Sequence, residues 1–579
     1  MYFPVLIDKA DGDVIRLSNT LRSNTNPAVQ TGNGTTRTVP PDRSRRVSVT
    51  NLTSFDTYAS ARAGFRWPTP DRYNIATVAC DVWAGSAPER TALVFADARG
   101  APSPVSYKEL ARAVNRMANA FVHLGVGRGD RVAIQLGQRI ETVAAHLAAY
   151  KLGAIAVPMA MLFGTEALGY RLTASGARLL VTTEEGAAKA PPTQAVVATV
   201  DGPSGEADLA ALMARASDRC DPAATGPDDP ALIIFTSGTT GPPKGAVHGH
   251  RVLLGHMPGV QMYQDLLPRP GDCFWTPADW AWAGGLLNVL LPSLAMGVPV
   301  VAQRAARFDP QESLDWAASA GVRNAFIPPT ALRMMRDTRP GLTLRSAGSA
   351  GEPLGAETFL WAREHLGVTI NEAYGQTECN LVLASCAGWG VAAPGVIGRP
   401  VPGHTVAIVD EDGIPLPDGV QGTIAVAAPD PVMFLGYWND EEATAAKFRG
   451  EWLMTGDQGI AGPDGVTFVG RDDDLINSAG YRIGPGEIED CLAGHPDVEL
   501  SAVVGRPDAL RGEIVVAFVK LRPGAARDAA QEKALKAFVR GRLSAHFYPR
   551  EIMFVDDIPL TTSGKVIRRA FRSELAGTA

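Results

Sequence analysis

The sequence predicts an α/β protein: a large N-terminal domain of helix-covered sheets with a small barrel-like section, followed by a smaller, mobile α+β C-terminal domain. Amphipathic helices such as 107–124 alternate with short apolar strands such as 131–135, 179–182 and 231–235. This alternation is typical of mainly parallel sheets covered by helices. Around 406–426 the pattern changes to strands separated by tight turns, which indicates a local antiparallel or barrel-like section.

Three segments divide the 579 residues, a length that by itself would allow about four domains. Residues 1–54 are rich in Ser, Asn and Thr and lack hydrophobic periodicity, which predicts a disordered tail; a transit peptide and an artefact of start-codon choice are the alternatives. Residues 55–472 carry the regular alternation. Residues 473–579 run helix, strand, strand and helix, which predicts a compact α+β unit.

Composition excludes several classes of protein. Charged residues make up 20% and hydrophobic residues 46%, as in globular proteins, and a net charge of −7 does not favour binding to nucleic acid or to an anionic membrane. The six cysteines form no C-x-x-C pair, which favours a reducing compartment, and we expect a cytoplasmic protein. Residues 280–302 are uncharged, but Pro292 and Pro299 interrupt them. We expect a buried helix at 283–291, a turn and a short strand there, and no membrane span.

The strongest local signal is a loop that follows the strand ending at Phe235. Its hydroxyls, glycine N–H groups and one lysine are groups that hold polyphosphate, although such a loop can also be a plain turn. It is not a Walker A loop, because Lys244 stands between Pro243 and Gly245. The candidate phosphate-binding residues are Thr236, Ser237, Gly238, Thr239, Thr240, Gly241 and Lys244.

This loop resembles the phosphate loop of the adenylate-forming superfamily, which contains the acyl-CoA synthetases, luciferases and adenylation domains. Further motifs of that superfamily follow in its order, and the resemblance covers about residues 55 to 575. These motifs are Ala350-Gly351-Glu352-Pro353, Tyr374-Gly375-Gln376-Thr377-Glu378, Thr455-Gly456-Asp457, Gly470 to Ile476 with Gly480-Tyr481-Arg482, and Ser563-Gly564-Lys565.

The resemblance implies an enzyme that uses ATP and Mg²⁺ to activate a small carboxylic acid. Thr377 would bind the α-phosphate and Glu378 would hold Mg²⁺, a cation that prefers oxygen ligands. Tyr374 would stack on adenine, beside the segment Gly351, Glu352 and Pro353. Lys565 would bridge the substrate carboxylate and the α-phosphate. Without the resemblance, these residues would be interpreted as a buried tyrosine, plain turns and a solvated lysine.

The remaining implied roles concern the ribose, the hinge and coenzyme A. Asp457 would accept hydrogen bonds from both ribose hydroxyls, and Arg471 would donate to the same sugar. The C-terminal domain would swing about Asp473 after the acyl-adenylate forms. Gly480 and Arg482 would then face coenzyme A, the second substrate.

The choice of acid follows from two positions. Gly375 stands where acetyl-specific members of the family carry a bulky ring, and Trp282 falls where the medium-chain enzymes have a pocket tryptophan. The resemblance therefore favours a medium-chain or aromatic acid–CoA ligase. A stand-alone adenylating ligase that loads a carrier protein, and a nucleotide-binding regulatory protein without catalysis, are the alternatives.

The sequence raises the question of two further partners and of one metal site. Pro559 precedes Lys565 with the spacing of family lysines that are acetylated, so a lysine acetyltransferase is a candidate partner. Homo-oligomerisation is left open. His248 and His250 form a His-x-His pair, for which a structural strand-to-helix junction is favoured over a metal site.

Overall fold

The computed structural model describes residues 51–96, 100–203, 205–236, 242–303, 308–339, 341–478, 481–508, 511–543, 548–561 and 566–577. These residues belong to the second of two compact units into which the chain divides, Met1–Arg46 and Val47–Ala579. The predicted N-terminal tail therefore lies mostly outside the described residues. From residue 51 onward the structure has the mixed α/β class that the sequence predicts.

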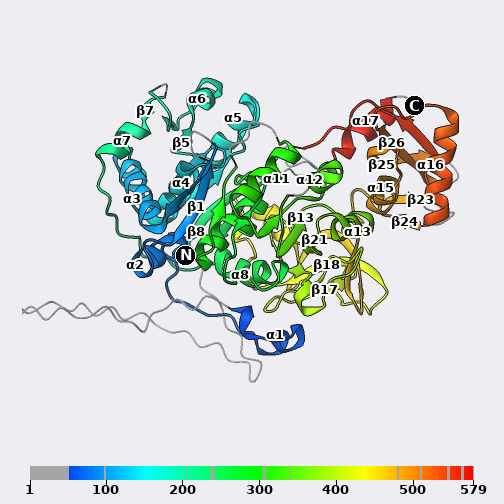
Figure 1. Cartoon of the computed structure of the whole chain (residues 1–579), viewed down its shortest axis with the longest axis horizontal. Helices are drawn as coiled ribbons and strands as arrows, with labels where there is room; N and C mark the ends of the chain where they lie inside the picture. The colour runs from blue at the N-terminus through cyan, green and yellow to red at the C-terminus, as the bar shows by residue number, and fades with distance from the viewer. Residues whose placement is uncertain are drawn as a thin grey trace, which may run out of the picture. The chain divides into compact units, whose positions relative to one another are not determined.

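The first sheet ends in the hairpin that carries the candidate phosphate loop. Its strands β3, β4, β5, β6 and β7 run parallel, while β8 pairs with β9 and β9 with β19 in antiparallel fashion. The helices α3 (Tyr107–His123), α4 (Ile140–Leu152) and α5 (Thr165–Ser175) gather around these strands (Figure 1). In sheet order the strands are β19 (Gly436–Tyr437), β9 (Gly245–Gly249), β8 (Pro230–Phe235), β4 (Ile155–Pro158), β3 (Arg131–Ile134), β5 (Leu179–Thr182), β6 (Val196–Thr199) and β7 (Ala207–Asp208).

The second sheet is parallel from β1 through β14 and antiparallel at both ends. β13 and β14 are central to the site, because two of the candidate motifs begin where these strands end. In sheet order the strands are β16 (Arg399–Pro400), β15 (Leu383–Ala384), β14 (Ile370–Tyr374), β13 (Ser346–Ala350), β12 (Asn324–Phe326), β10 (Phe274–Trp275), β11 (Val300–Val301), β1 (Thr91–Ala96) and β2 (Pro102–Ser106).

The uncharged segment 280–302 forms a buried helix that is longer than predicted. It runs through α9 (Ala283–Gly285), a π-helical turn (Leu286–Leu290) and α10 (Leu291–Met296), and it ends at Gly297. Pro292 does not end the helix, because it closely follows the π-helical turn, where the regular pattern of helix hydrogen bonds is already interrupted.

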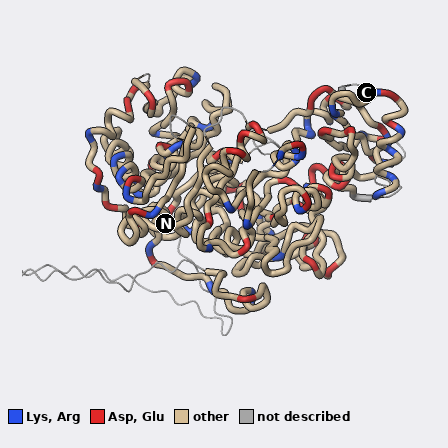
Figure 2. Tube along the Cα trace, viewed as in Figure 1, with Lys and Arg blue, Asp and Glu red and all other residues tan. Residues whose placement is uncertain are grey.

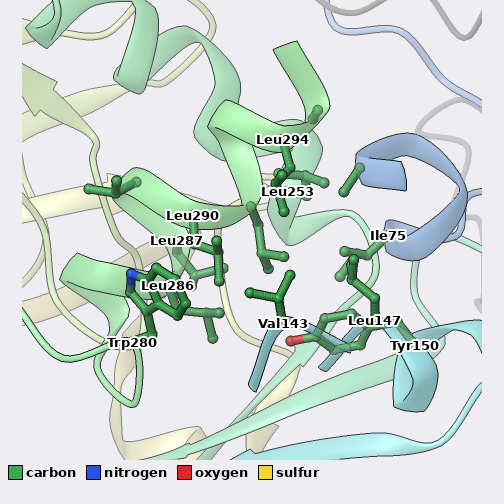
Figure 3. Close-up of a cluster of buried hydrophobic side chains, with 14 of the residues drawn as sticks. Ile75, Val143, Leu147, Tyr150, Leu253, Trp280, Leu286, Leu287, Leu290 and Leu294 are labelled. Atoms are coloured by element: carbon green, nitrogen blue, oxygen red, sulfur yellow. The ribbon is translucent and has the colours of Figure 1, made fainter. Parts of the chain in front are cut away.

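Side chains from this long helix, from α4 and from α8 (Val252–Tyr263) meet in one buried cluster, which Figure 3 shows. The segment is therefore part of the core between layers. Among the described residues, no helix has the length and apolar character that crossing a membrane requires.

The section around 406–426 is antiparallel, as predicted. β17 (Val406–Val409), β18 (Gln421–Ala427), β21 (Trp452–Gly462) and β20 (Phe448–Arg449) form one sheet, and β22 (Gly465–Arg471) also pairs with β21. Alternate residues of β18 and β21 are buried in a core that also contains Tyr374 from β14. This shared core packs the antiparallel sheet against the end of β14.

The C-terminal residues form an α+β unit with a core of its own, as predicted. In its sheet β24 (Tyr481–Ile483), β23 (Ile476–Ser478), β26 (Gly512–Leu521) and β25 (Val498–Asp508) are antiparallel, and β27 (Glu551–Phe554) adds to β26 in parallel. The helices are α15 (Pro485–Ala493), α16 (Ala529–Arg542) and α17 (Arg568–Gly577). The boundary between residues 472 and 473 stays a prediction.

A carboxyl group is buried in β14, two residues before the candidate magnesium motif begins at Tyr374. Glu372 is 5% exposed, and its Oε1 accepts a hydrogen bond from the Leu354 N–H at 3.0 Å. Burial raises the pKa of Glu372 to about 8, and the nearby charge of Asp490 adds to this effect. The side chain is therefore mostly protonated at neutral pH.

Gly375 follows β14 and lies against the backbone of a turn. A Cβ at this position would lie 2.6 Å from the Cα of Asn380 and closer still to the N of Leu381, a residue that itself has φ +62°. Because both contacts are with backbone, no side-chain rotation relieves them. The absence of a side chain at Gly375 is therefore required by this turn.

We predict that Glu372→Gln stabilises the protein increasingly as the pH rises. The wild-type carboxyl has a folded pKa of about 8 against an ordinary value of 4.5, so its contribution to stability is fully present below about 4.5 and is lost as the pH rises through 8. Glutamine keeps the acceptor for Leu354 without the ionisation, and the gain at pH 7 should reach about 3 kcal/mol. Urea unfolding of both proteins between pH 5 and 8 measures this, and a pH-independent difference would contradict it.

We also predict that Gly375→Ala costs about 1–3 kcal/mol or more in unfolding free energy, because the new methyl group collides with backbone. Gly85→Ala in α2 (Val82–Ser86) is the matched control, since a Cβ there meets no atom within 4 Å. The control should be neutral or slightly stabilising, as expected for alanine in a helix. Equal unfolding midpoints for the two variants would show that the turn adapts to a side chain.

Candidate functional site

The candidate phosphate loop is closed at its base by a backbone hydrogen bond. The Thr236 N–H donates to the Lys244 carbonyl at 2.8 Å, and the Tyr170 hydroxyl from α5 donates to the Pro243 carbonyl at 2.9 Å. The residues Ser237, Gly238, Thr239, Thr240 and Gly241 lie outside the described residues. The structure therefore places both ends of the loop at the β8–β9 hairpin.

Lys244 is the described cation of this loop. Its Nζ lies 3.7 Å from Asp440 Oδ2 and 5.4 Å from the ring centroid of Tyr437. The Lys244 side chain is 42% exposed and that of Asp440 is 38% exposed, so this ion pair is a weak one. A phosphate group could compete with Asp440 for this ammonium group.

Tyr374 and Gln376 connect the predicted magnesium motif to the predicted ribose motif. The Tyr374 hydroxyl donates to Asp457 Oδ2 at 2.7 Å, and Gln376 Nε2 donates to the same oxygen at 2.6 Å and to the Thr455 carbonyl at 3.0 Å. Burial, followed by the charge of Asp457, raises the pKa of Tyr374, so the phenol stays a donor. The Tyr374 ring is only 8% exposed, and its stacking on adenine stays a prediction.

Asp457 and Arg471 are direct partners across the antiparallel strands β21 and β22. Arg471 Nε lies 4.0 Å from Asp457 Oδ1 and 3.2 Å from Asp473 Oδ1. Burial alone would lower the pKa of Arg471, but the charges of Asp457 and Asp473 raise it. The ladder thus brings the two predicted ribose residues together, with the predicted hinge residue beside them.

Glu378, the predicted magnesium ligand, is held by a residue that sequence reasoning missed. The Tyr437 hydroxyl donates a hydrogen bond to Glu378 Oε1, and Glu378 is 8% exposed. Burial, followed by the charge of Glu378, raises the pKa of Tyr437. A carboxylate held in this way offers the hard oxygen ligand that Mg²⁺ prefers, so the residues present fit that ion.

His248 and His250, which follow the phosphate loop in the sequence, are both buried in the protein. Burial lowers the pKa of His248 to about 3, and its ring lies against the backbone of Thr377. His250 Nδ1 accepts a hydrogen bond from the Ile75 N–H at 3.2 Å. Across the described ranges, no group of three or more His, Cys, Asp or Glu residues could hold a metal ion.

The segment on the predicted adenine side follows β13. Gly351 has φ +96°, a conformation that favours glycine. Glu352 accepts hydrogen bonds from the Thr330 hydroxyl at 2.9 Å and from Arg333 at 2.8 Å. Glu352 is thereby anchored to α12 (Pro329–Met334), while Pro353 is exposed.

The two predicted acyl-pocket residues have different surroundings. The Trp282 ring meets the Phe163 ring edge-on, with centroids 5.9 Å apart. The guanidinium carbon of Arg171 lies 4.1 Å from the centroid of the Phe163 ring. Gly375 contacts backbone, as described above, so its missing side chain is explained without a pocket. The acyl role of both residues stays a prediction.

The C-terminal candidates are only partly described. Gly480 and Lys565 lie outside the described residues, as does the side chain of Arg482. A cationic cluster that sequence reasoning did not identify surrounds Tyr548: the guanidinium carbons of Arg550 and Arg540 lie 4.4 Å and 5.5 Å from its ring centroid.

Sequence signals for the missed residues are weak. Tyr437 and Gln376 reach their partners across separations of 59 and 81 residues. Gly436 has φ +142° and Asn439 has φ +55°, one on each side of Tyr437. These two residue types indicate a turn in the sequence, but they do not indicate that Tyr437 contacts Glu378. Positive and negative residues are interspersed along the described chain, as Figure 2 shows, so charge patterning did not mark the site either.

Two family models match the chain. The model described as AMP-binding enzyme matches residues 80–438, and the model described as AMP-binding enzyme C-terminal domain matches residues 487–565. The first covers the phosphate loop and the Tyr374 to Glu378 motif, and the second begins after the hinge motif.

Individual proteins agree with these models. Acyl-coenzyme A synthetase ACSM3, mitochondrial, of Mus musculus is 32% identical over 549 residues, which cover 90% of this chain and 94% of that protein. The crystal structure of Brucella canis acyl-CoA synthetase superposes with a TM-score of 0.68 at 33% identity, covering 90% of this chain and 100% of the other. That of the anthranilate CoA ligase AuaEII, in complex with anthranoyl-AMP, superposes with a TM-score of 0.80 at 26% identity, covering 88% and 99%.

The ordered motifs, their convergence where the end of β14 meets the middle of β21, and the agreement over nine-tenths of the chain lead to one conclusion. This chain belongs to the AMP-binding enzymes of the adenylate-forming superfamily.

Proposed function

We propose that this protein is an ATP-dependent acid–CoA ligase. A carboxylate and ATP would give an acyl-adenylate and pyrophosphate, and transfer of the acyl group to coenzyme A would then give acyl-CoA and AMP. The observation that carries this proposal is the pair of hydrogen bonds from Tyr374 and Gln376 to Asp457. These bonds join the segments for which we propose the ribose, metal and α-phosphate roles.

The first half-reaction brings two anions together, so the site has to neutralise charge. Lys244 would contact the triphosphate from the loop, and the Thr377 hydroxyl would donate to the α-phosphate. Mg²⁺ on Glu378 would screen the phosphate oxygens when it is bound. Thr377 is half-buried next to the buried Glu378, so both groups would act on the same part of the nucleotide.

The nucleoside would be held by the pair Asp457 and Arg471. A carboxylate can accept hydrogen bonds from two neighbouring hydroxyls, and the guanidinium group donates to sugar oxygens. Tyr374 and Gln376 orient Asp457 for this role. The adenine would lie between Tyr374 and the segment 351–353, as the resemblance implies.

The proposal for the second half-reaction rests on the family resemblance and on the group of arginines around Tyr548. Rotation about Asp473 would withdraw Lys565 and bring Gly480 and Arg482 to the thiol path, with the small domain beginning at residue 473. Arg540, Tyr548 and Arg550 combine cationic groups with a flat ring. This combination suits a phosphate-bearing nucleotide such as that of coenzyme A.

The acid is proposed to be a medium-chain or aromatic one. The Trp282–Phe163 pair offers an apolar, aromatic wall. Two relatives named above are acyl-CoA synthetases and one is an anthranilate CoA ligase. These names favour coenzyme A over a carrier protein as the acceptor, so the carrier-protein alternative finds no support here.

We expect purified protein to release AMP over many turnovers with an acid between butanoate and decanoate or with benzoate, and only when ATP, Mg²⁺ and coenzyme A are all present. Product thioesters are identified by mass spectrometry, and a phosphopantetheinylated carrier protein is offered in parallel. No coenzyme A-dependent AMP release with any of these acids would overturn the proposal. Thioester on the carrier protein alone would restore the alternative.

Lys565→Ala should slow adenylation by at least about 100-fold and leave thioester formation from supplied acyl-adenylate within about 3-fold of wild type. The reason is that a bridging cation acts only while carboxylate and α-phosphate approach each other. Pyrophosphate exchange measures the first step and thioester formation the second. Lys536→Ala on α16 is a control for loss of a lysine on a helix of the C-terminal domain. Equal losses in both steps would show that Lys565 has no step-specific role.

A further inference from the structure

Tyr437 lies beside the phosphate loop although it is distant in sequence. It belongs to β19, in which Gly436 pairs with Val247 and Tyr437 with Ala246 of β9. The Trp438 N–H donates to the Gly245 carbonyl at 2.7 Å, directly after Lys244. The strand pairing therefore fixes the backbone of Tyr437 next to the end of the loop.

The side chain of Tyr437 contacts two groups of the proposed adenylation site. Its hydroxyl donates to Glu378 Oε1, and its ring lies 5.4 Å from Lys244 Nζ. The first contact uses the polar end of the side chain and the second uses the ring. One residue thus lies between the predicted metal carboxylate and the predicted phosphate cation.

Local hydrogen bonds hold Tyr437 rigidly. Its N–H donates to the Thr444 hydroxyl at 2.8 Å, and that hydroxyl donates to the Asp440 carbonyl at 2.8 Å. Asp440 also caps α14 (Glu441–Ala446), since its Oδ1 accepts from the Ala443 N–H at 2.9 Å. The Phe434 ring packs edge-on at 5.0 Å between centroids.

The same cap positions the second partner of Lys244. Asp440 uses Oδ1 for the cap, while its Oδ2 lies 3.7 Å from Lys244 Nζ. A half-exposed ion pair of this kind is weak. Lys244 is therefore kept near the site by the ring and the carboxylate, and a triphosphate can draw it away.

We propose that Tyr437 is a positioning residue for adenylation, whose hydroxyl orients the Glu378 carboxylate for the metal ion and whose ring keeps Lys244 at the end of the phosphate loop. This inference rests on the proposed function. A carboxylate that accepts one hydrogen bond keeps further lone pairs for a metal ion, and because it is already oriented it would lose less conformational freedom when the ion binds.

The test is Tyr437→Phe in the full-length protein, which removes the hydroxyl and keeps the ring. Calorimetry measures ATP binding with and without Mg²⁺, and electron paramagnetic resonance measures Mn²⁺ binding in the presence of ATP. We expect the metal-dependent gain in ATP affinity to fall by about 10-fold or more, the size expected for a lost hydrogen bond to a charged group. Metal-free ATP affinity should change less than about 2-fold, because the ring still faces Lys244.

A double-mutant cycle with Glu378→Gln shows whether Tyr437 acts through Glu378. In the Glu378→Gln background, Tyr437→Phe should cause no further loss of Mn²⁺ affinity, whereas independent effects would multiply. Multiplying effects would overturn the proposal. A purely structural role of Tyr437 also predicts multiplying effects. The cycle therefore distinguishes a structural role from a role that acts through Glu378.

Tyr58→Phe is the matched control, because its hydroxyl is also partly buried and donates to the Pro400 carbonyl at 2.8 Å, away from Glu378. It should leave the metal-dependent gain unchanged. If the metal ion increases the ATP affinity of Tyr437→Phe as much as that of the wild type, the inference is overturned while the proposed function stays intact. If the wild-type protein itself shows no metal-dependent ATP binding, the proposed function fails and the inference fails with it.

Discussion

The hydrogen bond from Tyr374 to Asp457 is the contact on which the rest of the site depends. Tyr374 ends β14 of the mainly parallel sheet, and Asp457 lies in β21 of the antiparallel sheet. Asp457 is the carboxylate proposed for the nucleoside, and Glu378, proposed for the metal ion, lies in the connection that follows β14. Because the bond is buried, breaking it would leave a polar group without a partner in the core. The contact therefore holds the end of β14 against β21.

The absence of a side chain at Gly375 is required by the turn that directly follows Tyr374. The backbone of Asn380 and Leu381 approaches so closely that only glycine fits after Tyr374. The turn then returns Glu378 toward Tyr437. Backbone packing therefore already explains the glycine at position 375, which the sequence suggested for acyl selection. A glycine in a motif cannot by itself be assigned to a substrate pocket.

Local patterns predicted most of the fold. Alternating helices and apolar strands, and the turn-rich section after residue 406, correspond to the observed parallel and antiparallel sheets. The helix after Trp282 exceeds its predicted end because a π-helical turn precedes Pro292, and single-residue propensities do not predict such a turn. In the site, the motifs gave roles to Asp457 and Glu378. They included Gln376 without a role and did not indicate Tyr437, because the partners of these two residues come from distant segments of the chain.

The electrostatics of the site explain how a chain with net charge −7 can bind polyphosphate. Its described cations are held by aspartates: Lys244 by Asp440, and Arg471 by Asp457 and Asp473. Lys244 is 42% exposed and Arg471 is 45% exposed, so solvent screens both and their ion pairs are weak. A nucleotide with several negative charges can replace such partners at low cost, whereas the aspartates keep the cations in place until it arrives. In the proposed function, nucleotide binding would depend on this exchange of partners within the site and not on an overall positive surface.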